Sequence, residues 1–199
     1  VMAIGKRIGL PIEIASEARE SELAYWVGTL GETQQAVIDN GSRSIEFVTH
    51  DPKTGYQWKV YNLGYRVSFK KFFEGAKDFP SAKASMEKEL RATLDSVSFM
   101  KEQKKYVGVE FSEVVDFSFQ LDSEKTQVLT LKTLLSKCGE YEKMTAKEFS
   151  ELKSKPNADR ALPRLVVASF FAQKWGYSEM TVVERELGVG LLIERALRK

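Results

Sequence analysis

Residues 44–61, SIEFVTHDPKTGYQWKVY, decide the fold. Ile45 and Phe47 alternate with Glu46 and Val48, and after the segment 51–55 aromatic residues alternate with polar ones. A period of two places successive side chains on opposite faces of a strand, and the Asp, Pro and Gly of DPKTG are typical turn residues. The stretch therefore predicts a β-hairpin with strands at about 44–50 and 56–61.

Aromatic residues continue beyond this hairpin to Phe73, but they change position in the alternation. Trp58 has even parity, whereas Tyr61 and Tyr65 have odd parity. Because a strand cannot change the face of its side chains without a break, residues 62–64 predict a turn or a bulge. A third antiparallel strand over about 65–69 would complete a meander.

Helical patterns flank these strands. Leu23, Trp26, Val27 and Leu30 have helical spacing, which predicts a helix from about Ser16 that ends only at Asn40-Gly41. A long amphipathic helix is expected over 81–104, followed by a strand over 107–121 with a bend near 112–113. The last third predicts helices at 127–138, at 145–153, at 158–175 and on to residue 199, and Thr145 with Glu148 forms a capping box.

These patterns together predict an α+β protein. Its antiparallel sheet has about four to five strands covered by the long helix, with a helical C-terminal region beside it. We expect residues 1–125 to form the sheet domain with its N-terminal helix. Residues 126–199 form a helical region packed against it, or one continuous domain with it.

Composition limits the class of protein. A chain of 199 residues with 43% hydrophobic residues can bury a core, and a formal charge of +2 gives no overall attraction for polyanions. One cysteine and one histidine, Cys138 and His50, exclude an internal disulfide and a Cys/His zinc site. Because no run of about 18 apolar residues occurs, we expect neither a signal peptide nor a membrane span, and a cytoplasmic location.

The stretch from Tyr56 to Phe73 suggests a function. It holds seven of the 22 aromatic residues (12 Phe, 7 Tyr and 3 Trp), and no acidic residue lies between Asp51 and Glu74. Aromatic faces stack on bases and basic groups neutralise phosphates, so we predict a non-enzymatic protein that binds single-stranded DNA or RNA without a cofactor. The predicted binding residues are Tyr56, Trp58, Lys59, Tyr61, Tyr65, Arg66, Lys70 and Lys71.

Other interpretations stay open. The same composition is typical of a buried amphipathic hairpin, or of a structural or assembly protein whose aromatic surface binds a protein partner or a second copy. A third interpretation is a transcriptional regulator, because the spacing of five residues resembles a helix-turn-helix. These are Ala172, Gly176, Ser178, Thr181 and Val182, although Glu184 and Glu186 would repel DNA phosphates.

Catalytic patterns are weak. His50 and Asp51 are adjacent, so on a strand they point to opposite faces. Glu110 and Asp116 share strand parity and are the candidate metal ligands; a nuclease-like pair of Asp51 with Lys59 lacks an acidic residue two positions before the lysine. Cys138 is expected to be a packed thiol. The sequence therefore predicts no catalytic and no metal-binding residue.

Overall fold

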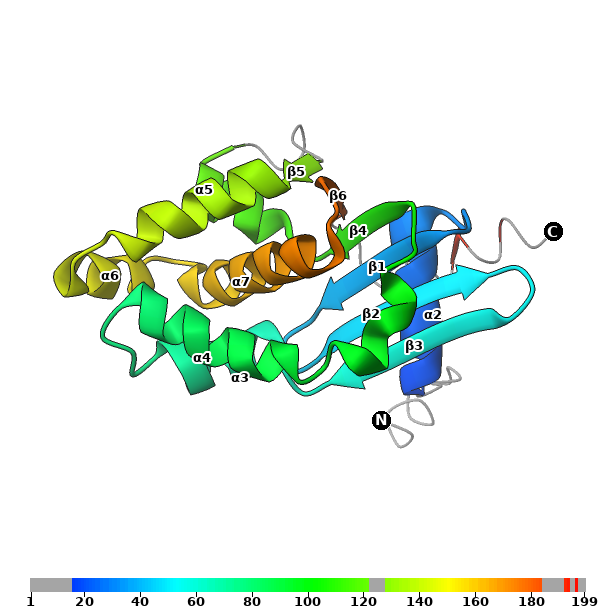
Figure 1. Ribbon diagram of the computed structural model, residues 1–199, viewed down its shortest axis with the longest axis horizontal. Helices are drawn as coiled ribbons and strands as arrows, with labels where there is room; N and C mark the ends of the chain where they lie inside the picture. The colour runs from blue at the N-terminus through cyan, green and yellow to red at the C-terminus, as the bar shows by residue number, and fades with distance from the viewer. Residues whose placement is uncertain (1–15, 122–127, 184–191, 194–195, 197–199) are drawn as a thin grey trace, which may run out of the picture.

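The sheet of this protein is mixed, and its strands lie in one half of the molecule, with most of the helices extending into the other half (Figure 1). The computed structural model describes residues 16–121, 128–183, 192, 193 and 196. The six strands lie in the order β3-β2-β1-β4-β6-β5, with β4 parallel to both β1 and β6 and the remaining neighbours antiparallel. The strands are β1 (Gln35–Asn40), β2 (Ile45–Asp51), β3 (Gly55–Tyr61), β4 (Lys105–Val109), β5 (Val128–Thr130) and β6 (Glu179–Val183).

Helices cover the two faces of the sheet unequally. Figure 1 shows α2 (Glu17–Thr29) behind the sheet, with the other helices in front of it and beside it. We call these the α2 face and the helix-rich face. The other helical elements are α3 (Tyr65–Ser68), η1 (Phe69–Phe73), α4 (Phe79–Arg91), η2 (Asp95–Met100), η3 (Val114–Ser118), α5 (Leu131–Glu142), α6 (Ala146–Lys153) and α7 (Ala158–Trp175).

Alternation along the central strands divides the core into two clusters. Ile38 of β1 belongs to the large cluster on the helix-rich face, where α7 is buried along almost its whole length. Val37, one residue earlier, belongs to a small cluster with Tyr25 and Val27 of α2. Adjacent residues of one strand thus serve opposite layers, as the pleat requires.

Several local predictions are confirmed. The hairpin of β2 and β3 closes where Asp51 pairs with Gly55, and α2 begins after Ser16, whose side chain accepts a hydrogen bond from the Arg19 N–H. The capping box of Thr145 and Glu148 starts α6, and α7 covers the predicted residues 158–175. Cys138 is buried beside Ser169, as expected for a packed thiol.

The prediction of a purely antiparallel sheet is wrong, because the first helix is much shorter than expected. It ends at Leu30, whose φ of 53° is left-handed, and residues 35–40 form the central strand β1. Every residue of β1 is buried, so its sequence shows no alternation between polar and apolar residues. The parallel pairing of β1 with β4 could not be expected without that strand.

The predicted third strand at 65–69 is helical instead. Tyr65, Phe69, Phe72 and Phe73 are also spaced i, i+4, i+7 and i+8, which fits α3 and the π-helical turn η1 equally well. The predicted long helix 81–104 is α4, capped earlier by Asp78, followed by the separate 3₁₀ helix η2.

The C-terminal predictions need two further corrections. The strand expected at 107–121 ends at Val109, before the left-handed Glu110, and the chain continues as the turn η3.

The prediction of a helix-turn-helix is wrong, because the segment expected to form its second helix is the strand β6, in which Val182 pairs with Gly108. Strands β5 and β6 join the sheet built from the first half of the chain. Most of the helix expected after Val183 lies outside the described residues.

Within the described ranges, none of the helices combines the length and the apolar character that crossing a bilayer requires.

Candidate active site

The turn between β1 and β2 is held by the start of α3. The N–H groups of Gly64, Tyr65 and Arg66 donate hydrogen bonds of 2.9, 2.9 and 3.1 Å to the carbonyl oxygens of Arg43, Gly41 and Ser42. Helix α3 packs against α7, on the helix-rich face. The three carbonyl groups of the turn therefore all point towards this face.

The amide groups of the same turn point the other way. In a trans peptide the N–H is antiparallel to the preceding C=O, so the N–H groups of Ser42, Arg43 and Ser44 point away from α3 and from the helix-rich face. Within the described part of the chain these three groups, which we call the turn amides, donate no hydrogen bond. Successive free N–H groups in a turn form a site for an anion.

A pair of buried carboxyl groups borders the turn amides. Asp39 and Glu46 lie directly opposite each other on β1 and β2, with only 7% and 9% of their surfaces exposed. Both share the alternation of the α2-facing Val37 and Val48, and Ser21 of α2 donates a hydrogen bond of 3.2 Å to Glu46. One oxygen of Asp39 is buried without a partner among the described residues. Such an unsatisfied group indicates a ligand, a water molecule or a catalytic role.

Burial also changes the acidity of this carboxylate pair. It raises the pKa of Asp39 well above its ordinary value. The nearby charges of Glu110 and Glu46 raise this pKa further, and Glu20 adds a smaller increase. The positive charge of Arg164 lowers it. Burial likewise raises the pKa of Glu46, although the hydrogen bond from Ser21 lowers it. A carboxylate with a raised pKa accepts a proton more readily, as a general base requires.

The raised pKa of Asp39 has a predicted effect on stability. Above about pH 4, where the unfolded chain has lost this proton, the folded chain still holds it, so the ionisation of Asp39 reduces stability as pH rises. Asp39→Asn removes this loss. We therefore expect the free energy of unfolding of the variant, relative to that of the parent chain, to increase from pH 4 to pH 8. Urea unfolding at several pH values measures the difference.

Asp51→Asn is the matched control. Backbone N–H groups of Lys53 and Thr54 lower the pKa of the exposed Asp51, so its stabilisation is present above the ordinary pKa and is lost at low pH. The control variant is expected to be less stable than the parent chain at pH 8 and equal to it in acid. A stability difference for Asp39→Asn that did not change with pH would contradict the assignment.

Arg164 of α7 connects the ends of β1 and β4. Its side chain is 2% exposed; Nη2 lies 2.7 Å from the Asn40 carbonyl oxygen and 2.8 Å from Oε2 of Glu110, and Nη1 forms an ion pair with Glu113. The guanidinium also lies 4.6 Å from the centre of the Tyr65 ring. Because all these partners belong to the protein, Arg164 positions the strand ends that carry the site.

In the described ranges, no cluster of three or more His, Cys, Asp or Glu side chains is arranged to hold a metal ion. Glu110 follows β4, whereas Asp116 lies in the helical turn η3, so the two no longer share a strand.

The structure separates the aromatic residues that the sequence grouped into one binding surface. Tyr56 and Trp58 pack against the small cluster on the α2 face. Tyr61 packs against the large cluster and forms a hydrogen bond with Ser96, and Tyr65 is 7% exposed beneath Arg164. These rings therefore serve both layers of the core and form no common surface.

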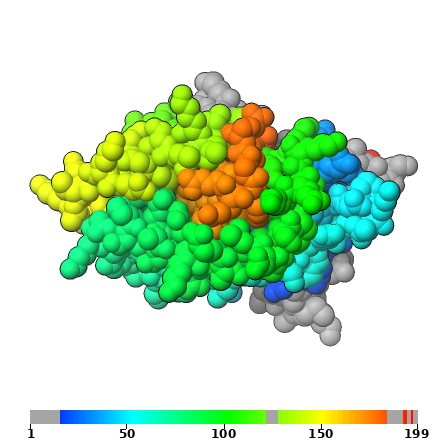
Figure 2. All heavy atoms as spheres, in the orientation of Figure 1, coloured from blue at the N-terminus to red at the C-terminus, as the bar shows by residue number. Residues whose placement is uncertain are grey.

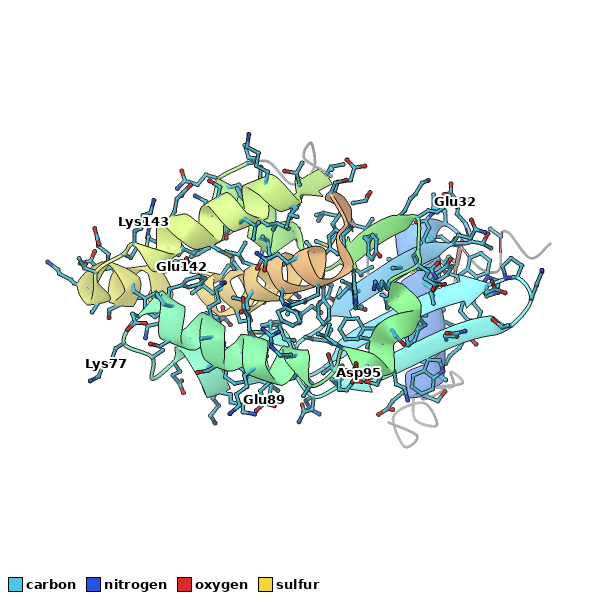
Figure 3. The ribbon with its side chains drawn as sticks, in the orientation of Figure 1. Glu32, Lys77, Glu89, Asp95, Glu142 and Lys143 are labelled. Atoms are coloured by element: carbon cyan, nitrogen blue, oxygen red, sulfur yellow. The ribbon has the colours of Figure 1, made fainter. Side chains whose placement is uncertain are left out.

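The predicted basic residues are exposed and lie on two different parts of the fold. Lys59 is on β3, whereas Arg66, Lys70 and Lys71 follow on α3 and η1. Lys71 is already 2.7 Å from Glu89, which Figure 3 shows on the outer side of α4.

The site residues that sequence reasoning missed are Asp39 and Glu46. The sequence feature that could have identified them is a turn with Gly and Ser between two acidic residues. It was missed because the same residues are also typical of the end of a helix.

Comparison with solved structures shows the fold. A Ppx/GppA family member from Aquifex aeolicus has a TM-score of 0.78 at 17% identity, covering 98% of this chain and 67% of that chain. An exopolyphosphatase-like protein has a TM-score of 0.76 at 15% identity, covering 98% and 71%. An exopolyphosphatase from Cytophaga hutchinsonii has a TM-score of 0.71 at 16% identity, covering 96% and 67%. No family model and no curated protein matches the sequence.

This likeness corrects the predicted function. The chain shares its α+β fold with exopolyphosphatases, so the predictions of a nucleic-acid-binding protein and of a non-enzyme are wrong. The aromatic packing described above removes the physical basis of the first prediction, and β6 removes that of a helix-turn-helix regulator. A protein partner or a homo-oligomer stays a prediction.

Proposed function

We propose that this chain carries the catalytic groups of a hydrolase that removes phosphate from an inorganic polyphosphate chain. One observation carries the proposal: the turn amides and the carboxylate pair of Asp39 and Glu46 face the same side of one end of the sheet. An anion site and a proton acceptor are the two groups that such a reaction needs. The fold shared with exopolyphosphatases supports polyphosphate as the substrate.

The site lies where ligands bind in sheets with parallel strands. β1 and β4 run in parallel, and Asp39 pairs with Val109 at their carboxyl ends, immediately before Glu110. Ligands bind outside the carboxyl ends of such strands, because the loops there diverge from the sheet. In this chain those loops are the turn between β1 and β2 and the segment after Val109.

The geometry assigns each group a role. The oxygens of the terminal phosphate accept hydrogen bonds from the turn amides, and the exposed Arg43 in the same turn adds a positive charge. A water molecule forms a bond to the phosphorus atom while the bond to the bridging oxygen breaks. The water proton goes to the Asp39–Glu46 pair, and the shortened polyphosphate leaves as an anion that needs no proton.

The carboxylate pair gives the direct test. Asp39→Asn and Glu46→Gln keep the shape of the side chains but remove the proton acceptor, so each is expected to lower kcat/KM about 100-fold or more. Release of inorganic phosphate from polyphosphate, with magnesium present, measures the effect. In the parent chain the rate should rise with pH as the carboxylate pair, whose pKa is raised, loses its proton.

Glu89→Gln is the control, because this glutamate is exposed and forms an ion pair with Lys71 on the outside of the molecule. It should leave phosphate release within about twofold of the parent rate. Adenosine triphosphate as a second substrate separates a requirement for polyphosphate from general phosphoanhydride hydrolysis. If the parent chain releases no phosphate from either substrate, or if the two carboxylate variants retain full activity, the proposal is wrong.

A further inference from the structure

A concave site lies at the end of β4 opposite to the carboxylate pair. A pocket of about 450 Å³, which is within the usual range for small-molecule sites, opens beside the amino ends of β4 and β6. On the face shown in Figure 2, the loop before β4 and the turn between α7 and β6 lie next to each other. The lining of this pocket includes Lys101, Lys104, Lys105, Trp175, Ser178 and Glu179.

Charge is the first feature of this lysine pocket. Three lysines line it against a single carboxylate, that of Glu179. Lys105 is 3.2 Å from Glu32, which Figure 3 labels, whereas Lys101 and Lys104 form no ion pair with any described residue. Positive charges that line one pocket repel one another, and an anion bound there reduces this repulsion. Lys101 follows the helix η2, where the helix dipole favours a cation. Lys104 precedes β4 and Lys105 begins it, so no helix dipole favours a positive charge at these two positions.

The floor of the lysine pocket is rigid. Tyr106 is stacked on Tyr177 with ring centres 4.2 Å apart, and its hydroxyl donates hydrogen bonds to the carbonyl oxygens of Met100 and Lys101 at 3.1 and 3.2 Å. These bonds fix the start of the loop that carries the lysines. A fixed floor lowers the entropic cost of binding, since only the lysine side chains have to be ordered.

The rings select against a base as the ligand. Trp175 is already stacked on Phe171 with ring centres 4.3 Å apart, and it lies beside Tyr106. The groups left for a ligand are polar: the ammonium groups of the lysines and the exposed hydroxyl groups of Ser178 and Thr181. All of these can donate hydrogen bonds to oxygen atoms that carry negative charge.

We propose that the lysine pocket binds a small oxyanion with several negative charges, of the diphosphate class. One carboxylate in the lining leaves an excess of positive charge, which suits a ligand with two or more charges better than a singly charged one. The site lies at the amino ends of β4 and β6, away from the carboxylate pair at the carboxyl ends, so binding here does not depend on the proposed hydrolysis.

Isothermal titration with methylenediphosphonate, a diphosphate that cannot be hydrolysed, tests the proposal. The chain should bind about one equivalent, and Lys101→Gln with Lys104→Gln should weaken binding about tenfold or more. Lys88→Gln with Lys143→Gln removes the same charge from exposed positions outside the pocket and should change binding less than about twofold.

Two further measurements keep the result specific. Binding should persist in Arg43→Gln, which removes the positive charge from the phosphate-binding turn of the proposed active site and so separates the two sites. Circular dichroism should show that both double lysine variants are folded. Absence of saturable binding by the parent chain, equal weakening in the two double lysine variants, or loss of binding in Arg43→Gln would each overturn the proposal.

Discussion

Gly64→Ala should destabilise this protein by about 3 kcal/mol or more, measured as the free energy of unfolding in urea. A Cβ atom at Gly64 would lie 2.4 Å from the carbonyl carbon of Arg43, 2.4 Å from the Ser44 nitrogen and 2.5 Å from the Gly41 carbonyl oxygen. All three are backbone atoms, so none can move aside as a flexible side chain would. The φ of Gly64 is −59°, which any residue adopts, so crowding alone is responsible.

The same substitution should also reduce phosphate release, because the displaced turn carries the turn amides. Gly139→Ala is the control, since a Cβ atom at Gly139 would meet nothing within 4 Å and the residue is inside α5. Alanine favours a helix over glycine, so this variant should be stabilised by about 0.5–1 kcal/mol. Similar unfolding energies for the two variants would show that α3 does not hold the turn as closely as described.

Arg164→Met is the second substitution with a large expected effect, a loss of about 3–5 kcal/mol. Methionine fills most of the volume but removes the buried guanidinium that binds Glu110, Glu113 and the Asn40 carbonyl oxygen. Arg164→Lys should recover little of this loss, because one ammonium group cannot reach three acceptors in a plane as a guanidinium does. Urea unfolding of the three proteins measures both effects.

Arg160→Met provides the comparison on the same helix. The Arg160 side chain is 45% exposed and lies 3.1 Å from Glu113, so its loss should cost less than about 1 kcal/mol. Adding Glu110→Gln and Glu113→Gln to Arg164→Met should return part of the stability, since the two side chains that lost Arg164 then carry no charge. Equal losses at Arg160 and Arg164, or no recovery in the triple variant, would contradict the buried network.

Local chemistry made part of this fold predictable. The DPKTG turn set the hairpin, Thr145 with Glu148 set the start of α6, and the apolar spacing of residues 158–175 set α7. The central strand β1 was missed for the opposite reason. It is buried on both faces, so its residues show no alternation, and only the pairing with the distant β4 identifies it.

The candidate site was less predictable than the fold, because main-chain atoms form half of it. The turn amides depend on the direction of three peptide groups, which α3 fixes from about twenty residues further along the chain, and no side-chain pattern encodes that direction. Asp39 and Glu46 become opposite neighbours only when β1 is a strand. Extending the first helix placed Asp39 in a helix, so its pairing with Glu46 of the predicted strand was not considered.

The position of β4 has a consequence for how the chain reaches this structure during synthesis. β4 lies between β1 and β6, and β6 starts only at Glu179, about seventy residues after β4 has ended. Until the ribosome has released those residues, one side of an apolar strand that contains Val107 and Val109 has no strand to pair with. The sheet therefore closes late, and a nascent chain that has passed β4 but not β6 is the stage most exposed to aggregation and to chaperones.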